Sequence, residues 1–338
     1  MRKQLISKLS QIVSRDLGNR GIGKLIEKYT NNSSDSTIKQ SELYCGNEHS
    51  IGKIVDEFIM PKVDCQKDVI SNKYISIITG FSVPPNGFSE NDGPLGAIWI
   101  GLGIVKYSNL NVLYFVDENQ YNAISKFANM VFESMKDRIK IVKITKSDLD
   151  NVKQSSSISE CIENIDSMIS IERVGKTKDS NYYSMRGIDI SSYNLSMDRL
   201  IDHVREIKPE TQLISIGDGG NEIGMGNVID GVAQFIPNGD KIACAVKCNQ
   251  LLICGVSNWG GYLLYLLFEH CNSSLTLQTM QGINIELDRS YLEYMNNECK
   301  MVDGVRNQPT MSVDGLEYDL VHANILKELN ECFQSSNQ

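Results

Sequence analysis

Ile-Ser-Ile-Gly-Asp-Gly-Gly-Asn-Glu-Ile-Gly-Met-Gly, residues 214–226, says more about the architecture of this chain than any other segment. The apolar run before the glycines, 212–216, predicts a buried strand that ends where they begin. Glycine permits positive φ and close approach of other groups, a cost usually met where function requires it. Acids on such a turn, at the carboxyl end of a strand, suit a hard cation or a polar substrate. The alternative is an ordinary strand-to-helix loop with solvated acids.

These glycines do not form a nucleotide-binding loop. A phosphate loop requires a lysine after its last glycine, and no lysine follows here. A dinucleotide fingerprint requires glycine at its sixth position, where this segment has Glu222. Acids beside the turn would also repel a pyrophosphate. Nicotinamide and flavin chemistry are therefore disfavoured.

Outward from this segment, apolar strands followed by acids or amides and then by a helix recur along the chain. This alternation predicts an α/β layered fold with a largely parallel or mixed central sheet flanked by helices. No internal repeat is visible, so we predict a single domain over residues 1–338, with a polar, flexible loop over 31–36. The predicted strands are 75–79, 112–116, 139–144, 167–172, 212–216 and 251–256, and the predicted helices include 95–105, 120–135 and 262–270.

The composition excludes several classes of protein. A net charge of −9 argues against a general nucleic-acid binder, because phosphate contacts need a basic surface. There is no apolar run of about 18 residues, so no membrane span is predicted. The nine cysteines include no Cys-x-x-Cys pair, which favours a reducing, cytoplasmic location. The basic N-terminus leaves the mitochondrial matrix as the alternative, although residues 5–13 have the spacing of an amphipathic helix.

Acids that follow separate strands are expected to meet. The carboxyl ends of parallel strands share one edge of a sheet, so these groups converge there. Like charges at close range raise one another's pKa unless a cation balances them. Oxygen ligands favour Mn²⁺ or Mg²⁺, with Ca²⁺ as a further option, over zinc. The acids expected to converge are Asp92, Glu118, Glu172, Asp218 and Glu222, and the metal ligands predicted among them are Asp92, Glu118 and Asp218.

Each of these residues also has a structural interpretation. Asp92 stands in an ordinary turn sequence. Glu118 begins a predicted helix, where acids interact favourably with the helix dipole. Glu172 is followed by Arg173, and the two suit a structural ion pair. Asn258 suits a role in satisfying loop backbone.

A further candidate is an arginine in the segment 182–190. The planar guanidinium of Arg186 can clamp a carboxylate or a phosphate through two parallel hydrogen bonds. The alternative is a surface salt bridge with Asp189. Both interpretations stay open on the sequence alone.

Two segments together resemble a known family. Residues 216–226 and Val-Ser-Asn-Trp-Gly-Gly-Tyr at 256–262 resemble the D-glutamate cyclase C-terminal domain family. The resemblance runs from about Val13 to Leu329, although the usual Thr-Asp-Gly-Pro-Pro-Gly motif has Asn91 and Leu95 in place of threonine and the second proline. Further motifs occur in the family's order at 79–81, 91–94, 185–187 and 313–315.

This resemblance implies conversion of D-glutamate to 5-oxo-D-proline and water, assisted by a divalent cation. Glu222 or Glu172 would take the ammonium proton, and Arg186 would hold the α-carboxylate. The residues expected to bind the substrate are Asn221, Asn258, Gly219, Gly220 and Tyr183.

Two other functions fit the same acids. A Mn²⁺- or Mg²⁺-dependent phosphatase would use them to hold its metal and a phosphate ester. A non-catalytic domain that binds a metal or a small ligand would keep them without turnover. The sequence predicts a small-molecule ligand and gives no oligomeric state.

Overall fold

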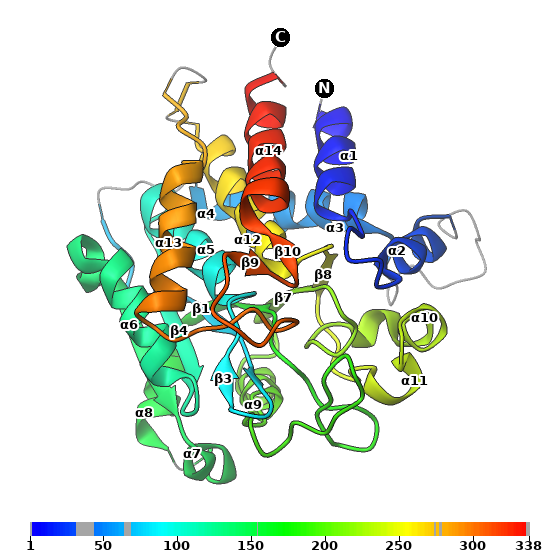
Figure 1. Cartoon of the computed structure of the whole chain (residues 1–338). Helices are drawn as coiled ribbons and strands as arrows, with labels where there is room; N and C mark the ends of the chain where they lie inside the picture. Colours follow the sequence, from blue (N-terminus) through cyan, green and yellow to red (C-terminus); the bar gives the residue numbers. More distant parts are fainter. Residues whose placement is uncertain are drawn as a thin grey trace.

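The computed structural model of the chain describes residues 2–31, 44–63, 69–153, 155–273, 275–276 and 279–335. Six parallel strands form one sheet, and helices cover both of its faces (Figure 1). This confirms the predicted α/β layered fold. The loop predicted over 31–36 lies outside the described residues, apart from Asn31 at the end of a helix.

The central sheet follows the strands predicted from the sequence. The bounds of most strands differ by one or two residues, and the largest difference is in the last strand, which ends at Ile253 and not at residue 256. Two residues later, Gly255 N donates to Val13 O at 2.7 Å, and this takes the backbone away from the sheet edge. The strands are β1 (Tyr74–Thr79), β4 (Asn111–Asp117), β5 (Ile139–Ile144), β6 (Ile165–Ile171), β7 (Gln212–Gly217) and β8 (Gln250–Ile253).

The order of the strands is β5-β4-β1-β6-β7-β8, with every neighbouring pair parallel. The chain starts at β1, builds outward to β5, returns beside β1 as β6 and builds outward the other way. The loops after β1 and β6 therefore diverge, and such a reversal point opens a crevice at the carboxyl ends of the strands. The fold thus indicates where a ligand would bind.

The strands place alternate side chains in two separate cores. Ile75 and Ile77 enter one core, and Ile78 enters the other. The first core is covered by α1 (Arg2–Val13), α3 (Asn47–Lys53), η2 (Ile54–Ile59), α4 (Met60–Val63), α5 (Pro94–Tyr107), α6 (Tyr121–Val131), α12 (Ser257–His270), α13 (Ile285–Asn297), η5 (Tyr318–His322) and α14 (Ala323–Ser335). The second is covered by α2 (Ile22–Asn31), α7 (Lys146–Asp150), α8 (Ser156–Glu163), α9 (Asp198–Ile207), η4 (Gly226–Val228), α10 (Ile229–Phe235) and α11 (Gly239–Ile242).

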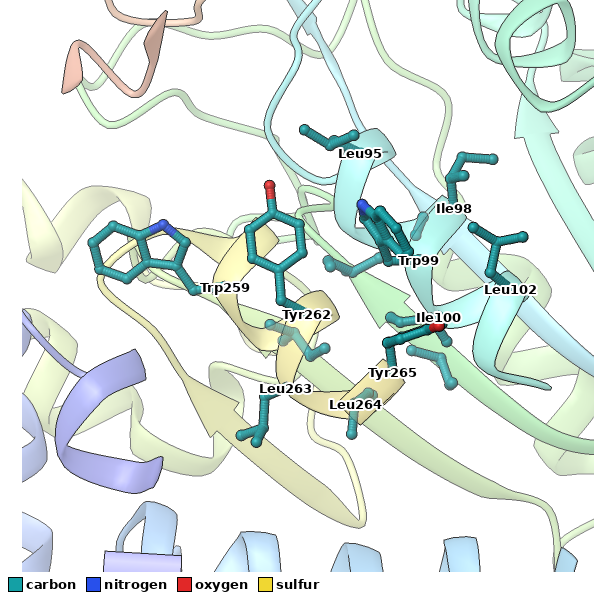
Figure 2. Close-up of a cluster of buried hydrophobic side chains, with 14 of the residues drawn as sticks. Leu95, Ile98, Trp99, Ile100, Leu102, Trp259, Tyr262, Leu263, Leu264 and Tyr265 are labelled. Atoms are coloured by element: carbon teal, nitrogen blue, oxygen red, sulfur yellow. The ribbon is translucent and has the colours of Figure 1, made fainter. Parts of the chain in front are cut away.

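Helices α5 and α12 lie directly on the first face and are apolar almost all round, as buried helices are. Figure 2 shows their side chains packed together, with Tyr262 of α12 between Trp259 and Trp99. The two backbones touch, because a Cβ on Gly261 would lie only 2.4 Å from the Cα of Gly96. This close packing places the N-termini of both helices side by side at the carboxyl edge of the sheet.

Two elements from opposite ends of the chain complete this layer. Helices α1 and α14 lie side by side (Figure 1). Arg15, after α1, donates to both carboxylate oxygens of Glu328 at 2.7 and 2.5 Å. Two hairpins, β2–β3 (Ser82–Val83 and Phe88–Ser89) and β9–β10 (Ser312–Val313 and Leu316–Glu317), lie outside the main sheet. Within the described ranges, no helix is both long and apolar enough to cross a bilayer.

Candidate functional site

The candidate site lies where the loops after β1, β6 and β7 meet the start of α12. Asp92 precedes α5, Glu172 follows β6, and Asp218 follows β7. Gly93 has φ +88°, and a Cβ there would lie 2.5 Å from the Cβ of Glu172. A glycine is therefore required beside Asp92, since both the backbone angle and the close approach exclude a side chain.

Two of these carboxylates lie at the N-terminus of α12. Ser257 N donates to one oxygen of Asp92 and to one of Asp218, each at 3.1 Å. Asn258 N donates to the other oxygen of Asp92 at 2.8 Å. The unpaired N–H groups and the dipole of a helix start both favour negative charge. The 14-residue α12 thus positions both acids.

Further carboxylates join them. The Ser257 hydroxyl donates to Glu172 at 2.6 Å. Carboxylate oxygens of Glu172, Asp218 and Glu222 lie within 4.8 Å of one another. Carboxylate oxygens of Asp92, Asp218 and Asp314 also lie within 4.8 Å of one another, and Asp314 lies in the turn between β9 and β10. The structure therefore brings together four of the five acids expected from the sequence and adds Asp314; we call these five residues the acid cluster.

Glu222 has a distinct place in the acid cluster, because its carboxylate folds back on its own loop. It accepts hydrogen bonds from Gly219 N at 2.6 Å, Gly220 N at 2.7 Å and Asp218 N at 3.2 Å. The glycines leave room for this turn, and the turn holds the loop after β7 in shape. Two substrate-binding residues predicted from the sequence, Gly219 and Gly220, thus direct their N–H groups at Glu222.

No pattern in the sequence pointed to the cation of the site. Arg20, between α1 and α2, forms ion pairs with Asp218 at 3.1 Å and Asp314 at 2.8 Å. Its Nη2 also donates to Gly255 O at 2.5 Å. Neither Arg20 nor Asp314 follows a strand of the main sheet, so the pattern of strand ends could not reveal them. The similarity of 313–315 to a family motif was the available signal for Asp314.

Four carboxyl groups of the acid cluster have raised pKa values, because they are buried with too little positive charge beside them. Burial raises the pKa of Glu172 well above its usual range, and Asp218 and Glu222 raise it further. Burial also raises the pKa values of Asp218 and Asp314, although Arg20 lowers both. Burial and the charge of Asp314 raise the pKa of Asp92 to about 7. Several members are therefore protonated at neutral pH unless a cation balances them.

A neighbouring acid, Glu90, lies just outside the cluster. Its side chain is 5% exposed, and its Oε1 has no hydrogen-bond partner in the described part of the chain. Burial raises its pKa well above the usual range, and so do Asp314 and Asp92. Burial and the neighbouring acids therefore favour the protonated, neutral form of Glu90.

Two predicted site residues lie elsewhere. Glu118 does not converge with the other predicted metal ligands, because its side chain is exposed and accepts from Lys146 N at 3.1 Å. It follows β4, two strands away from β6, and points to the surface beside β5. Arg186 is also exposed; it donates to Val305 O at 2.9 Å and forms neither the predicted salt bridge with Asp189 nor a contact with the acid cluster in the described structure.

The remaining predicted binders contact the site through its loops. The amide of Asn258 accepts from Gly93 N at 2.9 Å and Gly96 N at 2.7 Å, so it caps α5 and has the loop-backbone role given as its alternative. Asn221 Nδ2 donates to Tyr183 O at 2.8 Å, and its buried Oδ1 has no partner among the described residues. The Tyr183 hydroxyl turns away and donates to Asp179 at 2.8 Å.

Glu172 and Arg173 do not form the structural ion pair that their adjacency suggested. Arg173 is fully buried and pairs with Asp117 at 2.8 Å. It also donates to Gly80 O at 2.9 Å and to Leu195 O at 2.5 Å. The left-handed φ of Glu172, +43°, turns the chain between the two residues. One side chain therefore enters the acid cluster and the other enters a separate, paired centre.

A buried histidine holds the turn that carries Asp314. Trp259 Nε1 donates to His322 Nδ1 at 3.0 Å, so the other ring nitrogen carries the proton. That nitrogen lies 3.2 Å from both Val313 O and Leu316 O. Burial lowers the pKa of His322 to about 4, which keeps this arrangement neutral. His322 thus ties the start of α12 to the turn that carries Asp314.

Comparisons with known proteins agree with these motifs. A family model described as "D-glutamate cyclase-like, C-terminal" matches residues 9–330. The human protein named "D-glutamate cyclase, mitochondrial" is 28% identical over 352 aligned positions, which cover 96% of this chain and 51% of the human protein. The chain thus spans about half the length of this curated relative. The resemblance inferred from the motifs is confirmed.

Proposed function

This chain belongs to the D-glutamate cyclase-like C-terminal family, and on that premise we propose that it converts D-glutamate to 5-oxo-D-proline and water. The observation that carries the proposal is the excess of buried carboxylates over positive charge. Asp92, Glu172, Asp218 and Glu222 are all at most 5% exposed, and Arg20 is the cation that pairs with the cluster among the described residues. A ligand that brings positive charge, such as an α-ammonium group, would relieve this imbalance.

The reaction requires proton transfer within one small site. The ammonium group must lose a proton before its nitrogen attacks the γ-carboxyl carbon, and it loses a second when the amide forms. A carbon–oxygen bond then breaks, and the departing oxygen takes up two protons and leaves as water. The two protons lost by nitrogen equal the two gained by oxygen. The site therefore needs groups that accept a proton and return it, without any external acid.

The cluster has carboxyl groups suited to both steps. A pKa of about 7 lets Asp92 accept a proton and release it again near neutral pH. Glu172, whose pKa is raised well above its usual range by burial and by the neighbouring acids, would be the protonated acid that donates to the departing oxygen. Glu222 holds the loop after β7, so in this proposal the base role predicted for it passes to Asp92, and Glu172 acts as the acid.

A divalent cation would fit the same donors. The oxygens of Asp92, Asp218 and Asp314 form one set within 4.8 Å, and those of Glu172, Asp218 and Glu222 form another. All are carboxylate oxygens, the ligand type that Mg²⁺ and Mn²⁺ prefer over zinc. Bound there, the ion would polarise the γ-carboxyl group and stabilise negative charge on its oxygens. In this proposal Asp218 is the shared ligand, because it belongs to both sets.

The test compares stereoisomers and metals with the full chain. Purified protein is incubated with D- or L-glutamate, with and without Mn²⁺ or Mg²⁺, and 5-oxoproline is measured by chiral chromatography. We expect product from the D isomer alone. Glu172→Gln should lower the rate at least about a hundredfold, the scale of one acid–base group. The exposed Glu118→Gln is the matched control and should keep the wild-type rate.

Two other outcomes would redirect the assignment. Metal-dependent phosphate release from a generic ester, with no oxoproline, would favour the phosphatase alternative, which nothing in the comparisons supports. Metal binding without turnover of either substrate would favour a non-catalytic domain. Cell fractionation separates a cytoplasmic location from the mitochondrial one that appears in the name of the human relative.

A further inference from the structure

The turn that carries Asp314 is short and depends on support from outside itself. Asp314 and Gly315 are the two residues between β9 and β10, and both have left-handed φ angles, +56° and +75°. An Asp-Gly pair suits such a hairpin turn. Each strand beside it has only two residues, and so short a hairpin is at best marginally stable by itself. The position of Asp314 is therefore set by contacts with other parts of the chain.

Asp303 provides this support with both oxygens of its carboxylate. The side chain is fully buried, and Oδ2 accepts from Gly315 N at 2.8 Å and from the hydroxyl of Ser312. Oδ1 accepts from Val305 N at 2.8 Å and from Arg306 N at 3.0 Å, and Arg306 Nε pairs with Asp303 at 3.9 Å. An ionised carboxylate accepts at both oxygens, whereas one end of an asparagine side chain can only donate. The four donors therefore require an aspartate.

The backbone beside Asp303 is also tied to the segment that leads to Asp92. Val302 O accepts from Asn91 N at 2.8 Å, and Asn91 immediately precedes Asp92. Asp303 follows Val302 directly, and its side chain holds the turn of Asp314. The separation between Asp92 and Asp314, two of the three acids in one set of candidate ligands, therefore depends on Asp303.

From this arrangement we infer that Asp303 is a positioning residue for the acid cluster. It sets the separation of the Asp92 and Asp314 carboxylates, and thereby the affinity of the site for a divalent cation. The inference rests on the proposed function, in which Asp92, Asp218 and Asp314 form one set of ligands. Asp303 belongs to neither set, so it acts through Asp314. Removing a group that orients the ligands of a metal typically weakens binding about 10- to 100-fold.

The support from Asp303 differs from that of His322 on the same hairpin. His322 Nε2 lies 3.2 Å from the carbonyl oxygens of Val313 and Leu316, so it holds the strand residues. Asp303 holds the N–H of the residue that directly follows Asp314. In Asp303→Asn the hairpin should therefore stay docked, while the turn loses its fixed position.

The test is a double-mutant cycle with the full chain and Mn²⁺ alone as the probe. The dissociation constant is measured from the electron paramagnetic resonance signal of free Mn²⁺ for the wild type, Asp303→Asn, Asp314→Asn and the double variant. We expect Asp303→Asn to weaken Mn²⁺ binding about 10- to 100-fold. In the Asp314→Asn background the same change should weaken binding less than about threefold, because the positioned ligand is already gone.

A purely structural role for Asp303 predicts different results. Losses that multiply in the double variant would overturn the inference, and so would wild-type affinity in Asp303→Asn. The matched control is Asp288→Asn, because Asp288 is also fully buried and accepts from three donors but belongs to neither set of ligands. It should lose stability and change the dissociation constant less than about threefold. Equal weakening by Asp288→Asn would overturn the inference as well.

A milder variant decides the question if Asp303→Asn does not fold. Ser312→Ala removes one of the four donors and should weaken Mn²⁺ binding at least about twofold, again only while Asp314 is present. An unchanged dissociation constant in Ser312→Ala would then overturn the inference. Melting curves verify that each variant is folded.

Measuring oxoproline in the same preparations separates failure of the proposed function from failure of this inference. A wild-type chain that binds Mn²⁺ but leaves D-glutamate unchanged contradicts the cyclase proposal, and the cycle of dissociation constants still tests Asp303. A wild-type chain that forms oxoproline but binds no Mn²⁺ overturns the inference and keeps the cyclase proposal. A chain that does neither contradicts both.

Discussion

Two buried acidic centres at the same edge of the sheet are built in opposite ways. In one, Asp117 faces one arginine, Arg173, whose Nη1 and Nη2 donate to Asp117 and to two backbone carbonyls, although its buried Nε has no partner among the described residues. In the other, five carboxylates share Arg20. Consecutive residues, Glu172 and Arg173, enter the two centres. Removing one partner of a balanced buried pair destabilises the fold, whereas an unbalanced cluster of perturbed acids marks a candidate site for binding or chemistry.

The largest effect should come from breaking the balanced centre. Asp117→Asn leaves Arg173 buried without a counter-ion, which costs about 3–5 kcal/mol of unfolding free energy. Urea denaturation followed by circular dichroism measures this. A loss below about 1 kcal/mol would contradict the distinction between the two centres.

The same change in the acid cluster should act on activity instead. Asp218→Asn removes a carboxylate that belongs to both sets of candidate ligands, so we expect oxoproline formation to fall at least about a hundredfold. Its unfolding free energy should fall by no more than about 1 kcal/mol, because one of several repelling charges is removed. Unfolding comparable to that of Asp117→Asn would show that the two centres are alike.

Divalent cations should stabilise the chain through the acid cluster alone. At about 100 times its dissociation constant, Mn²⁺ should raise the unfolding free energy by about 2.7 kcal/mol at pH 8. The gain should shrink at pH 5, because protons on the raised-pKa carboxyl groups compete with the metal. Thermal shift assays measure it. The gain should persist in Glu118→Gln and vanish in Asp218→Asn; a gain that persists in both would place the ion elsewhere.

The smallest effect concerns the pH dependence of stability. The pKa of Asp92 is about 7 in the folded chain against 3.8 as its ordinary value, so the folded state holds a proton that the unfolded state releases. Stability from this group is complete below about pH 4 and is lost as pH rises towards 7, at no more than about 1.4 kcal/mol per pH unit. Asp92→Asn should flatten the metal-free profile over this range. An unchanged slope would mean that Asp92 ionises normally.

The sheet could be predicted from the sequence because each strand is a short apolar run that ends at turn residues. The convergence of Asp92, Glu172, Asp218 and Glu222 followed from the parallel topology alone. The expected position of Glu118 was wrong because β4 lies beyond the reversal point of the sheet, and the loop after this strand bends to the surface. Arg20 and Asp314 reach the site through packing of a loop and a hairpin from distant parts of the chain, and no local pattern encodes such packing.

The contact between α1 and α14 has a consequence for synthesis on the ribosome. Arg20 is translated before the strands of the sheet, and its partner Asp314 is translated after all of them. Until the β9–β10 hairpin docks, the nascent chain holds the arginine with one acid instead of two. Competence to bind a ligand would then arise only after the β9–β10 hairpin has been translated, together with the closing of α14 against α1.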